Sequence, residues 1–163
     1  MNKTEKYSDR SYQIDAIDRR IIRLLQEDGK MKIKEIAHAL KMTTTPIFER
    51  IKRLEQTGYI KGYTAIVDRE KLGFQLVAFC SVTLEVHNKN NIQLFVKQIN
   101  ELPEVAECYH IAGMFDYLLK IYVKDMLDYQ DFITNKLASL ANISRVQSSF
   151  VMTEIKQAHV LPI

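Results

Sequence analysis

The residues of this sequence whose types and spacing point most directly to chemistry are a run of threonines and the basic segment after it. Thr43, Thr44 and Thr45 precede Pro46, and hydroxyls before a proline are typical of the first turn of a helix, where backbone N–H groups lack partners within the helix. In residues 47–54, apolar side chains then recur at helical spacing. The outward or flanking positions of this predicted helix are Thr44, Thr45, Phe48, Glu49, Lys52 and Arg53, with Arg50 nearby.

A second short helix is predicted directly before this one. Apolar residues recur at helical spacing between Ile33 and Leu40, and the pattern breaks at Lys41 and Met42. Two short helices joined by a tight turn favour entry of the second helix into the major groove of DNA when that helix carries hydroxyls and cations. An ordinary amphipathic helical pair with a solvated charged face explains the same pattern, and this segment alone does not separate the two interpretations.

The charge distribution favours the nucleic-acid interpretation. The net charge is only +3, but it is unevenly spread. Residues 1–70 contain 15 Lys and Arg against 11 Asp and Glu, whereas residues 71–163 contain 8 against 9. The cationic excess lies in the half that contains the helical pair, so we expect double-stranded DNA as a partner.

The sequence offers little to a catalytic, metal-binding or membrane function. Cys80 and Cys108 are isolated and the four histidines lack ligand spacing, so neither a metal site nor a cofactor is expected. No Ser/His/Asp or Cys/His arrangement and no phosphate-cradling glycine loop occurs, so we do not expect an enzyme. No apolar run approaches the roughly 20 residues of a membrane span, and residues 1–13 lack the apolar core of a signal peptide. We therefore expect a cytoplasmic protein without membrane contact.

Hydrophobic periodicity predicts an α+β chain of two domains. Residues 1–13 are expected to form a flexible tail, and residues 14–67 a winged helix-turn-helix domain. This domain begins with a helix over residues 15–27 and ends with a short strand pair or wing over residues 59–67. The charged, glycine-ended segment 68–75 is the predicted linker.

The second predicted domain, residues 76–163, has the element order β-α-β-β-α-β. This order is typical of a ferredoxin-like fold with a four-stranded sheet. Two helices on one face leave the other face uncovered, although it includes apolar and aromatic residues. We therefore expect a second copy of the chain to cover that face in a homodimer.

The order and spacing of several segments across both domains resemble the leucine-responsive regulator/asparagine-regulator (Lrp/AsnC, feast-famine) family of transcriptional regulators. The resemblance extends from about Ile14 to the C-terminus. The matching segments are residues 15–22, 25–29, 43–55, 58–65, 102–108 and 113–119.

The resemblance implies an effector-binding and oligomerisation domain over residues 76–163. It also implies dimers that commonly assemble into octamers, and an amino acid or related small metabolite as effector rather than a cofactor. The matching ligand loop is Gly113, Met114, Phe115, Asp116 and Tyr117, to which Ser148 and Ser149 could add hydroxyl contacts. In such a loop glycine allows a ligand to approach the backbone, exposed N–H groups receive a carboxylate, and Asp116 meets an ammonium group. Without the resemblance, the favoured explanation of Gly113 and Asp116 is that they merely build a turn between strands, a common use of both residues.

Three positions depart from the family pattern. Lys41 stands in the turn where glycine is frequent, and a left-handed backbone there costs roughly 1 kcal/mol. Val146 replaces a threonine that often lines the effector pocket, and Met114 replaces an acidic or small residue. The last two leave the identity of the effector open.

The leading hypothesis is a sequence-specific DNA-binding transcriptional regulator that responds to an amino acid. We expect phosphate contacts from Lys52, Arg53 and Lys61, the last at the wing, while Thr43 opens the helix. Base-edge contacts are expected from Thr44, Thr45, Glu49 and Arg50. Two alternatives remain: a metabolite-binding or enzymatic domain with an incidental helical extension, and an oligomer that organises DNA without an effector.

Overall fold

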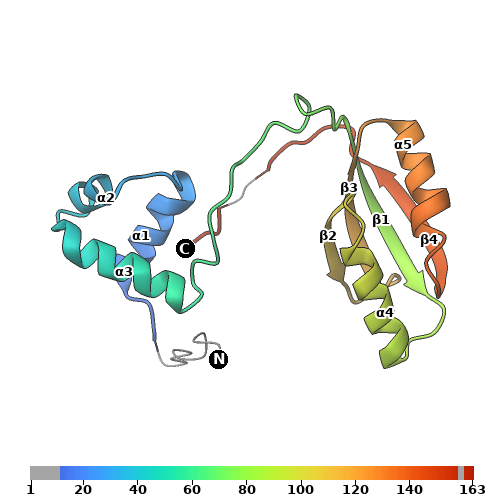
Figure 1. Cartoon of the computed structure of the whole chain (residues 1–163), viewed down its shortest axis with the longest axis horizontal. Helices are drawn as coiled ribbons and strands as arrows, with labels where there is room; N and C mark the ends of the chain where they lie inside the picture. The colour runs from blue at the N-terminus through green and yellow to red at the C-terminus, as the bar shows by residue number, and fades with distance from the viewer. Residues whose placement is uncertain (1–11, 158–159) are drawn as a thin grey trace, which may run out of the picture. The chain divides into compact units, whose positions relative to one another are not determined.

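The computed structural model describes residues 12–157 and 160–163 and forms two compact units (Figure 1). Of the described residues, unit 1 comprises 12–66 together with 156–157 and 160–163, and unit 2 comprises Val67–Ile155. Most of the expected flexible tail, residues 1–13, lies outside the described residues. Each unit has its own hydrophobic core, so the two are described separately.

Unit 1 contains the three predicted helices, α1 (Ala16–Glu27), α2 (Ile33–Ala39) and α3 (Thr44–Gln56). Asp15 begins α1 with a reciprocal capping box, in which its side chain accepts from the N–H of Asp18 at 2.8 Å and its own N–H donates to Asp18 at 3.1 Å. The fully buried side chains that hold the helices together come from the predicted apolar stripes. They are Ile21, Ile36, Ala37, Ile47 and Leu54.

The turn between α2 and α3 has a left-handed residue although it lacks a glycine. Lys41 has φ 54°, and its N–H donates to the carbonyl of His38 at 3.1 Å. The N–H of Met42 donates to the carbonyl of Ala37 at 2.9 Å, which completes the hydrogen-bond pattern of a Schellman cap. Thr43 is the N-cap residue of α3, but its hydroxyl makes no capping hydrogen bond.

The predicted strand pair over residues 59–67 is absent: within the described chain this segment has no strand. Its side chains are exposed apart from Ile60, whose N–H donates to the carbonyl of Leu54 at 3.0 Å. Residues with high strand propensity do not form a stable isolated pair, because two strands without further strands or a covering helix are marginal in water. The wing is therefore an extended segment that follows α3.

Unit 2 confirms the predicted order of strands and helices. Its elements are β1 (Leu76–Leu84), α4 (Lys89–Asn100), β2 (Val105–His110), β3 (Tyr117–Val123), α5 (Met126–Asp131), a π-helical continuation η1 (Phe132–Leu137) and β4 (Ile143–Phe150). The strands form one antiparallel sheet in the order β2-β3-β1-β4. This is the ferredoxin-like arrangement expected from the sequence.

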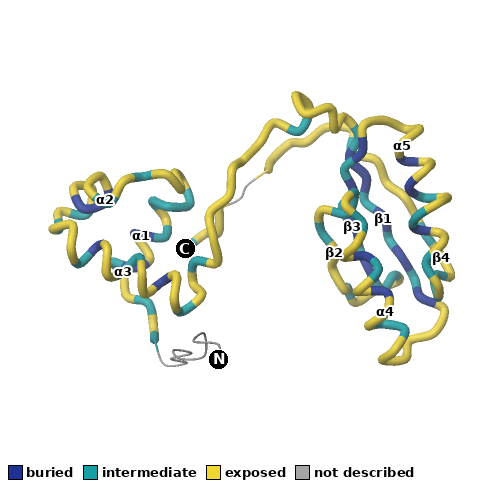
Figure 2. Tube along the Cα trace, viewed as in Figure 1, coloured by how far each residue is buried: buried dark blue, intermediate teal, exposed yellow. Residues whose placement is uncertain are grey.

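One face of this sheet packs against both helices. Alternate residues of β1 and β3 are buried together with side chains of α4 and the α5–η1 segment (Figure 2). The residues at this core include Cys80, Leu119, Phe95 and Phe132. Of the intervening positions of β1, which belong to the opposite face, Phe79, Ser81 and Thr83 remain partly accessible, whereas Val77 is buried.

A buried ion pair joins α3 to α1 in unit 1. Asp18 is 0% exposed, and its carboxylate receives Arg50 of α3 at 2.7 Å as well as the hydroxyl of Tyr12. Arg50 also contacts the capping residue Asp15 at 2.7 Å. Arg50 compensates the charge of the buried Asp18 carboxylate, so this carboxylate is stable in the core only while Arg50 stays in place.

We expect Asp18→Asn to lower the local unfolding free energy of unit 1 by about 3 kcal/mol, because the neutral amide loses the buried, charge-assisted hydrogen bonds that the carboxylate accepts from Arg50 and Tyr12. Hydrogen–deuterium exchange of α1 and α3 peptides measures this change, with unit 2 peptides as an internal reference. Glu27→Gln, at an exposed position of α1, is the matched control and should exchange like the unaltered protein. Equal protection in Asp18→Asn would contradict the assignment.

The acid stability of unit 1 should depend on Asp15. The N–H of Asp18, and then Arg50, hold the pKa of the Asp15 carboxyl below its usual value. A group whose pKa is lowered by folding stabilises the fold above its ordinary pKa of about 3.9, and this stabilisation is lost as the pH falls further. Asp15→Asn should therefore weaken the decline of unit 1 stability below about pH 4, measured by acid titration of the circular dichroism signal. An unchanged acid limb would contradict this role.

Candidate functional site

The outward surface of α3 carries polar and aromatic side chains. The exposed predicted contact residues are Thr43, Thr44, Thr45, Phe48, Glu49, Lys52 and Arg53. Phe48 is 47% exposed, a high value for an aromatic side chain in a folded unit. The hydroxyls, the acidic group and the cations on one short helix supply the donors and acceptors that base edges and phosphates require.

Arg50 does not belong to this outward surface. Its guanidinium is turned toward α1, where it contacts Asp18 and Asp15 at 2.7 Å each, and hydrogen bonding to Asp18 raises its pKa. This contact replaces the expectation that Arg50 reaches base edges. The basic side chain instead fixes α3 against α1, and sequence spacing gave no sign of this because its partners lie more than 30 residues away.

Arg53 lies at the edge of the outward surface against an aromatic ring. Its guanidinium carbon is 4.2 Å from the centroid of the Tyr12 ring, a cation–π distance. Tyr59 donates from its hydroxyl to the carbonyl of Tyr12 at 2.9 Å and meets that ring edge-on. The aromatic pair thus limits the positions that the Arg53 side chain can adopt.

Lys61 follows α3 on the extended segment and is exposed. The backbone bond from Ile60 to Leu54 holds the start of that segment on the end of α3. Tyr63 donates to Glu55 of α3 at 2.9 Å, and burial together with this bond raises the pKa of Tyr63 to about 12. Lys61 is therefore held near α3 although the wing has no strands.

The predicted ligand loop connects β2 to β3 in unit 2. Gly113 has φ 154°, a conformation that side chains disfavour, and no atom lies within 4 Å of where its Cβ would stand. Met114 is 82% exposed, and the Phe115 ring lies 5.4 Å from the guanidinium of Arg145 on β4. The loop backbone is consequently open to a ligand at its glycine.

Asp116 is the most constrained residue of this loop. Its Oδ2 accepts from the N–H of Leu84 at 2.8 Å and contacts Nε2 of His87 at 2.8 Å. The Leu84 N–H, followed by His87, lowers the pKa of the Asp116 carboxyl. Its own N–H donates to the carbonyl of Val82 at 3.0 Å, so the residue is fixed to the end of β1 from two sides.

The other predicted effector residues are not all brought to the loop. Tyr117 is 3% exposed and packs between His110 and Phe95, with ring centroids 4.9 and 4.6 Å away, so it belongs to the core. Ser148 accepts from the hydroxyl of Tyr129 at 2.5 Å, on the side of the sheet that faces the helices. Ser149 is exposed on the opposite side, next to Phe79 on β1.

Sequence reasoning missed four residues that shape these sites: Tyr12, Asp18, His87 and Arg145. The signal for His87 was available, since β1 ends where its antiparallel neighbour β3 begins, and a polar residue after β1 must lie near the loop. No comparable local signal pointed to Tyr12 or Asp18. Their roles depend on tertiary packing with α3.

Residues 12–157 and 160–163 contain neither a metal-binding cluster nor a membrane-spanning helix. No group of three or more His, Cys, Asp and Glu side chains there is arranged to hold a metal ion. None of the helices in the same residues has both the length and the hydropathy that a membrane span requires.

Two protein families match this chain. Residues 14–61 match the family described as winged helix-turn-helix DNA-binding, and residues 77–161 match the Lrp/AsnC ligand binding domain. The two matches follow units 1 and 2 and account for most of the chain.

Individual proteins and structures agree with these matches. The chain is 39% identical over 150 residues to the DNA-binding transcriptional activator DecR of Escherichia coli K12, with 92% of this chain and 99% of that protein covered. It is 35% identical to the leucine-responsive regulatory protein of Klebsiella pneumoniae, covering 92% of each.

Among solved structures, it resembles a transcriptional regulator of Neisseria meningitidis in complex with L-Met (TM-score 0.88, 31% identity, 92% and 97% covered). It also resembles an AsnC family regulator of Agrobacterium tumefaciens (TM-score 0.87, 34% identity, 91% and 97% covered). The chain belongs to the Lrp/AsnC family of DNA-binding transcriptional regulators.

Proposed function

We propose that α3 reads operator DNA and that an amino acid or related small metabolite, bound at residues 113–117, adjusts DNA affinity or assembly. The observation that carries the DNA step is the exposed face of α3, held outward by the ion pair between Arg50 and Asp18. A rigidly held helix presents its side chains in one register, as base recognition requires.

The contacts on DNA divide by the chemistry of the side chains. Lys52, Arg53 and Lys61 supply phosphate contacts, which give affinity without sequence preference. Thr44, Thr45 and Glu49 supply base-edge contacts in the major groove. Phe48, beside them on the exposed face, offers an apolar surface suited to a thymine methyl group.

The effector step is supported by the open loop and by the comparison with the L-Met complex, a protein 31% identical to this chain. A ligand carboxylate approaches the loop backbone at Gly113, where there is no side chain. Within the described residues, the Asp116 carboxylate is bonded through Oδ2, to the Leu84 N–H and to His87, so we assign Oδ1 to a ligand ammonium group. Arg145, across the Phe115 ring, is a further cation available to a carboxylate.

The assembly that we propose is a homodimer through the open face of the sheet, which assembles further to an octamer. Phe79 and Leu118 on that face are partly accessible, and Tyr109 on β2 is 49% exposed. Burial of such a face against a second copy removes apolar surface from water. A two-fold dimer would place two copies of α3 on half-sites about 34 Å apart, one helical turn of DNA.

Fluorescence anisotropy with DNA from the region upstream of the gene tests this function. Binding is measured at two salt concentrations, with and without a pool of amino acids, and the pool is divided to identify the effector. Salt-sensitive, sequence-preferring binding that shifts with the pool is the expected result. Binding without any shift would favour a DNA organiser without an effector. The enzymatic alternative has no support in the names of the relatives, which are transcriptional regulators.

Lys52→Ala should weaken binding to all DNA sequences alike and reduce the slope of log affinity against log salt by about 1. Lys52 is chosen over Arg53 because Arg53 also packs on Tyr12, so its removal would mix DNA contact with folding. Lys97→Ala, at an exposed position of α4, is the control. An unchanged slope in Lys52→Ala would count against this docking of α3.

Asp116→Asn should leave DNA binding in the absence of effector unchanged. It should raise the effector concentration that gives a half-maximal shift about tenfold, because a charge-assisted hydrogen bond to the effector is lost. The anisotropy titration is repeated with the identified effector. Glu101→Gln, which removes a carboxylate at the end of α4, serves as control. A response equal to that of the unaltered protein would show that the ligand site lies elsewhere.

A further inference from the structure

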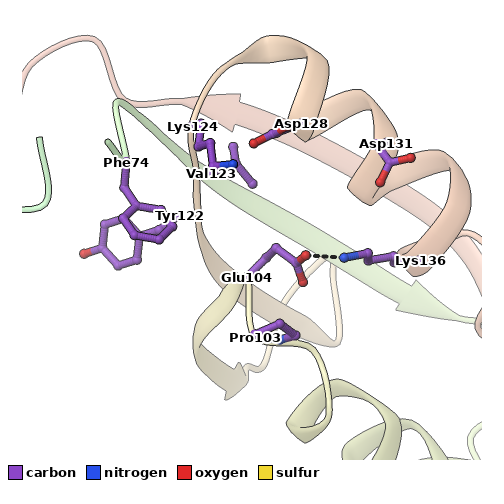
Figure 3. Close-up of a pocket in the computed structure, with 9 residues that line it drawn as sticks. All are labelled: Phe74, Pro103, Glu104, Tyr122, Val123, Lys124, Asp128, Asp131 and Lys136. Atoms are coloured by element: carbon purple, nitrogen blue, oxygen red, sulfur yellow. Dashed lines mark hydrogen bonds and ion pairs between the residues drawn. The ribbon is translucent and has the colours of Figure 1, made fainter. Parts of the chain in front are cut away.

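The exposed cation Arg53 of α3 is held by an aromatic ring, whereas other cations of the chain are held by carboxylates. Lys136, at a pocket of about 350 Å³ in unit 2, is paired with Glu104 (Figure 3). Among the residues that the structure describes, no carboxylate lies within ion-pair distance of Arg53, whose guanidinium carbon stands 4.2 Å from the centre of the Tyr12 ring. The charge of Arg53 therefore remains available to an anion from outside the protein.

Tyr12 itself is fixed by contacts with two neighbours. Its hydroxyl donates to the buried carboxylate of Asp18, and its carbonyl accepts from the hydroxyl of Tyr59 at 2.9 Å. The ring of Tyr59 meets the Tyr12 ring edge-on, with centroids 6.2 Å apart and planes at 82°. Tyr12 also packs, partly buried, against the apolar core of unit 1. The ring keeps one orientation, because another side-chain rotamer would give up the hydrogen bond to Asp18.

A guanidinium group held by an aromatic ring keeps its capacity to donate hydrogen bonds. The ring attracts the delocalised positive charge, whereas the N–H donors lie in the guanidinium plane and point outward along its edge. Two of these donors match two oxygens of a phosphate in a bidentate contact. An arginine that moves freely loses side-chain freedom when it binds, and this loss is smaller for an arginine that is already held.

We propose that Tyr12 is a positioning residue for DNA binding, which holds Arg53 on its ring so that the N–H edge of the guanidinium contacts a DNA phosphate. The inference rests on the proposed docking of α3 on DNA. It adds to that docking a residue that lies before α1, outside the three helices of unit 1. Tyr12 acts through Arg53 and makes no contact with DNA of its own.

Tyr12→Leu and Tyr12→Phe separate the role of the ring from that of the hydroxyl. Both substitutions remove the hydrogen bond to Asp18, but only leucine removes the ring. DNA binding by the full chain is measured by fluorescence anisotropy, on the upstream DNA and on a duplex of random sequence, and circular dichroism checks that both variants are folded. We expect Tyr12→Leu to bind both duplexes about fivefold more weakly than Tyr12→Phe, because the cation–π contact that restrains Arg53 is lost. Tyr12→Met, a second variant without a ring, should behave like Tyr12→Leu.

A double-mutant cycle links this loss of affinity to Arg53. In an Arg53→Ala background, measured at low salt where binding is strong, the Leu and Phe variants of Tyr12 should differ by less than about twofold, because no guanidinium is left to position. A ring that only supports the fold would give the same difference with and without Arg53, and that result would overturn the proposal. Equal DNA binding by the Leu and Phe variants that retain Arg53 would also overturn it.

The Lys52→Ala variant distinguishes a failure of this inference from a failure of the proposed function. If its salt slope falls while Tyr12→Leu binds DNA like Tyr12→Phe, α3 reads DNA as proposed but Tyr12 does not position Arg53. If neither Lys52→Ala nor Tyr12→Leu alters DNA binding, the proposed docking of α3 is wrong, and the role of Tyr12 is overturned with it.

Discussion

The orientation of α3 depends on one fully buried carboxylate, that of Asp18. It closes the capping box at the start of α1, receives the hydroxyl of Tyr12, and pairs with Arg50 of α3. Few alternative arrangements can satisfy a charge removed from water, so this contact selects one position of α3 against α1. Because Arg50 is turned inward, helical spacing directs Phe48, Glu49 and Lys52 to solvent. The outward face of α3 is thus a consequence of an interaction on the opposite side of the same helix.

The elements that could be predicted from the sequence are those defined by a residue pattern within a single segment. The stripes of α1 and α3 and the alternation of β1 and β3 repeat within each segment, so periodicity was sufficient to find them. The prediction was wrong at residues 59–67, where high strand propensity has no partner strand to pair with. The candidate DNA surface was predictable as a surface, but the roles of its residues were not. Arg50 and Arg53 look alike in the sequence, and only their distant contacts with Asp18 and Tyr12 distinguish them.

The turn before α3 shows that packing overrides local preference. A left-handed backbone at Lys41 costs roughly 1 kcal/mol relative to a glycine at the same position. Its capping hydrogen bonds and the burial of Ile36, Ala37 and Ile47 on either side offset this cost. The angle between α2 and α3 is therefore set by the core of unit 1 rather than by the permissiveness of one residue. A substitution at this turn changes stability more readily than geometry.

In unit 2 the register of the sheet determines what can act together. β1 pairs with β3 from Leu76–Val123 to Val82–Tyr117, which brings the end of β1 to the end of the 113–117 loop and fixes Asp116 through Leu84 and His87. β3 is buried on the helix-facing side and bonded to strands on both edges, so it does not bend easily. A ligand at the 113–117 loop would therefore act on a stiff element, and its effect would be transmitted as a shift of β3 as a whole against α4 and α5.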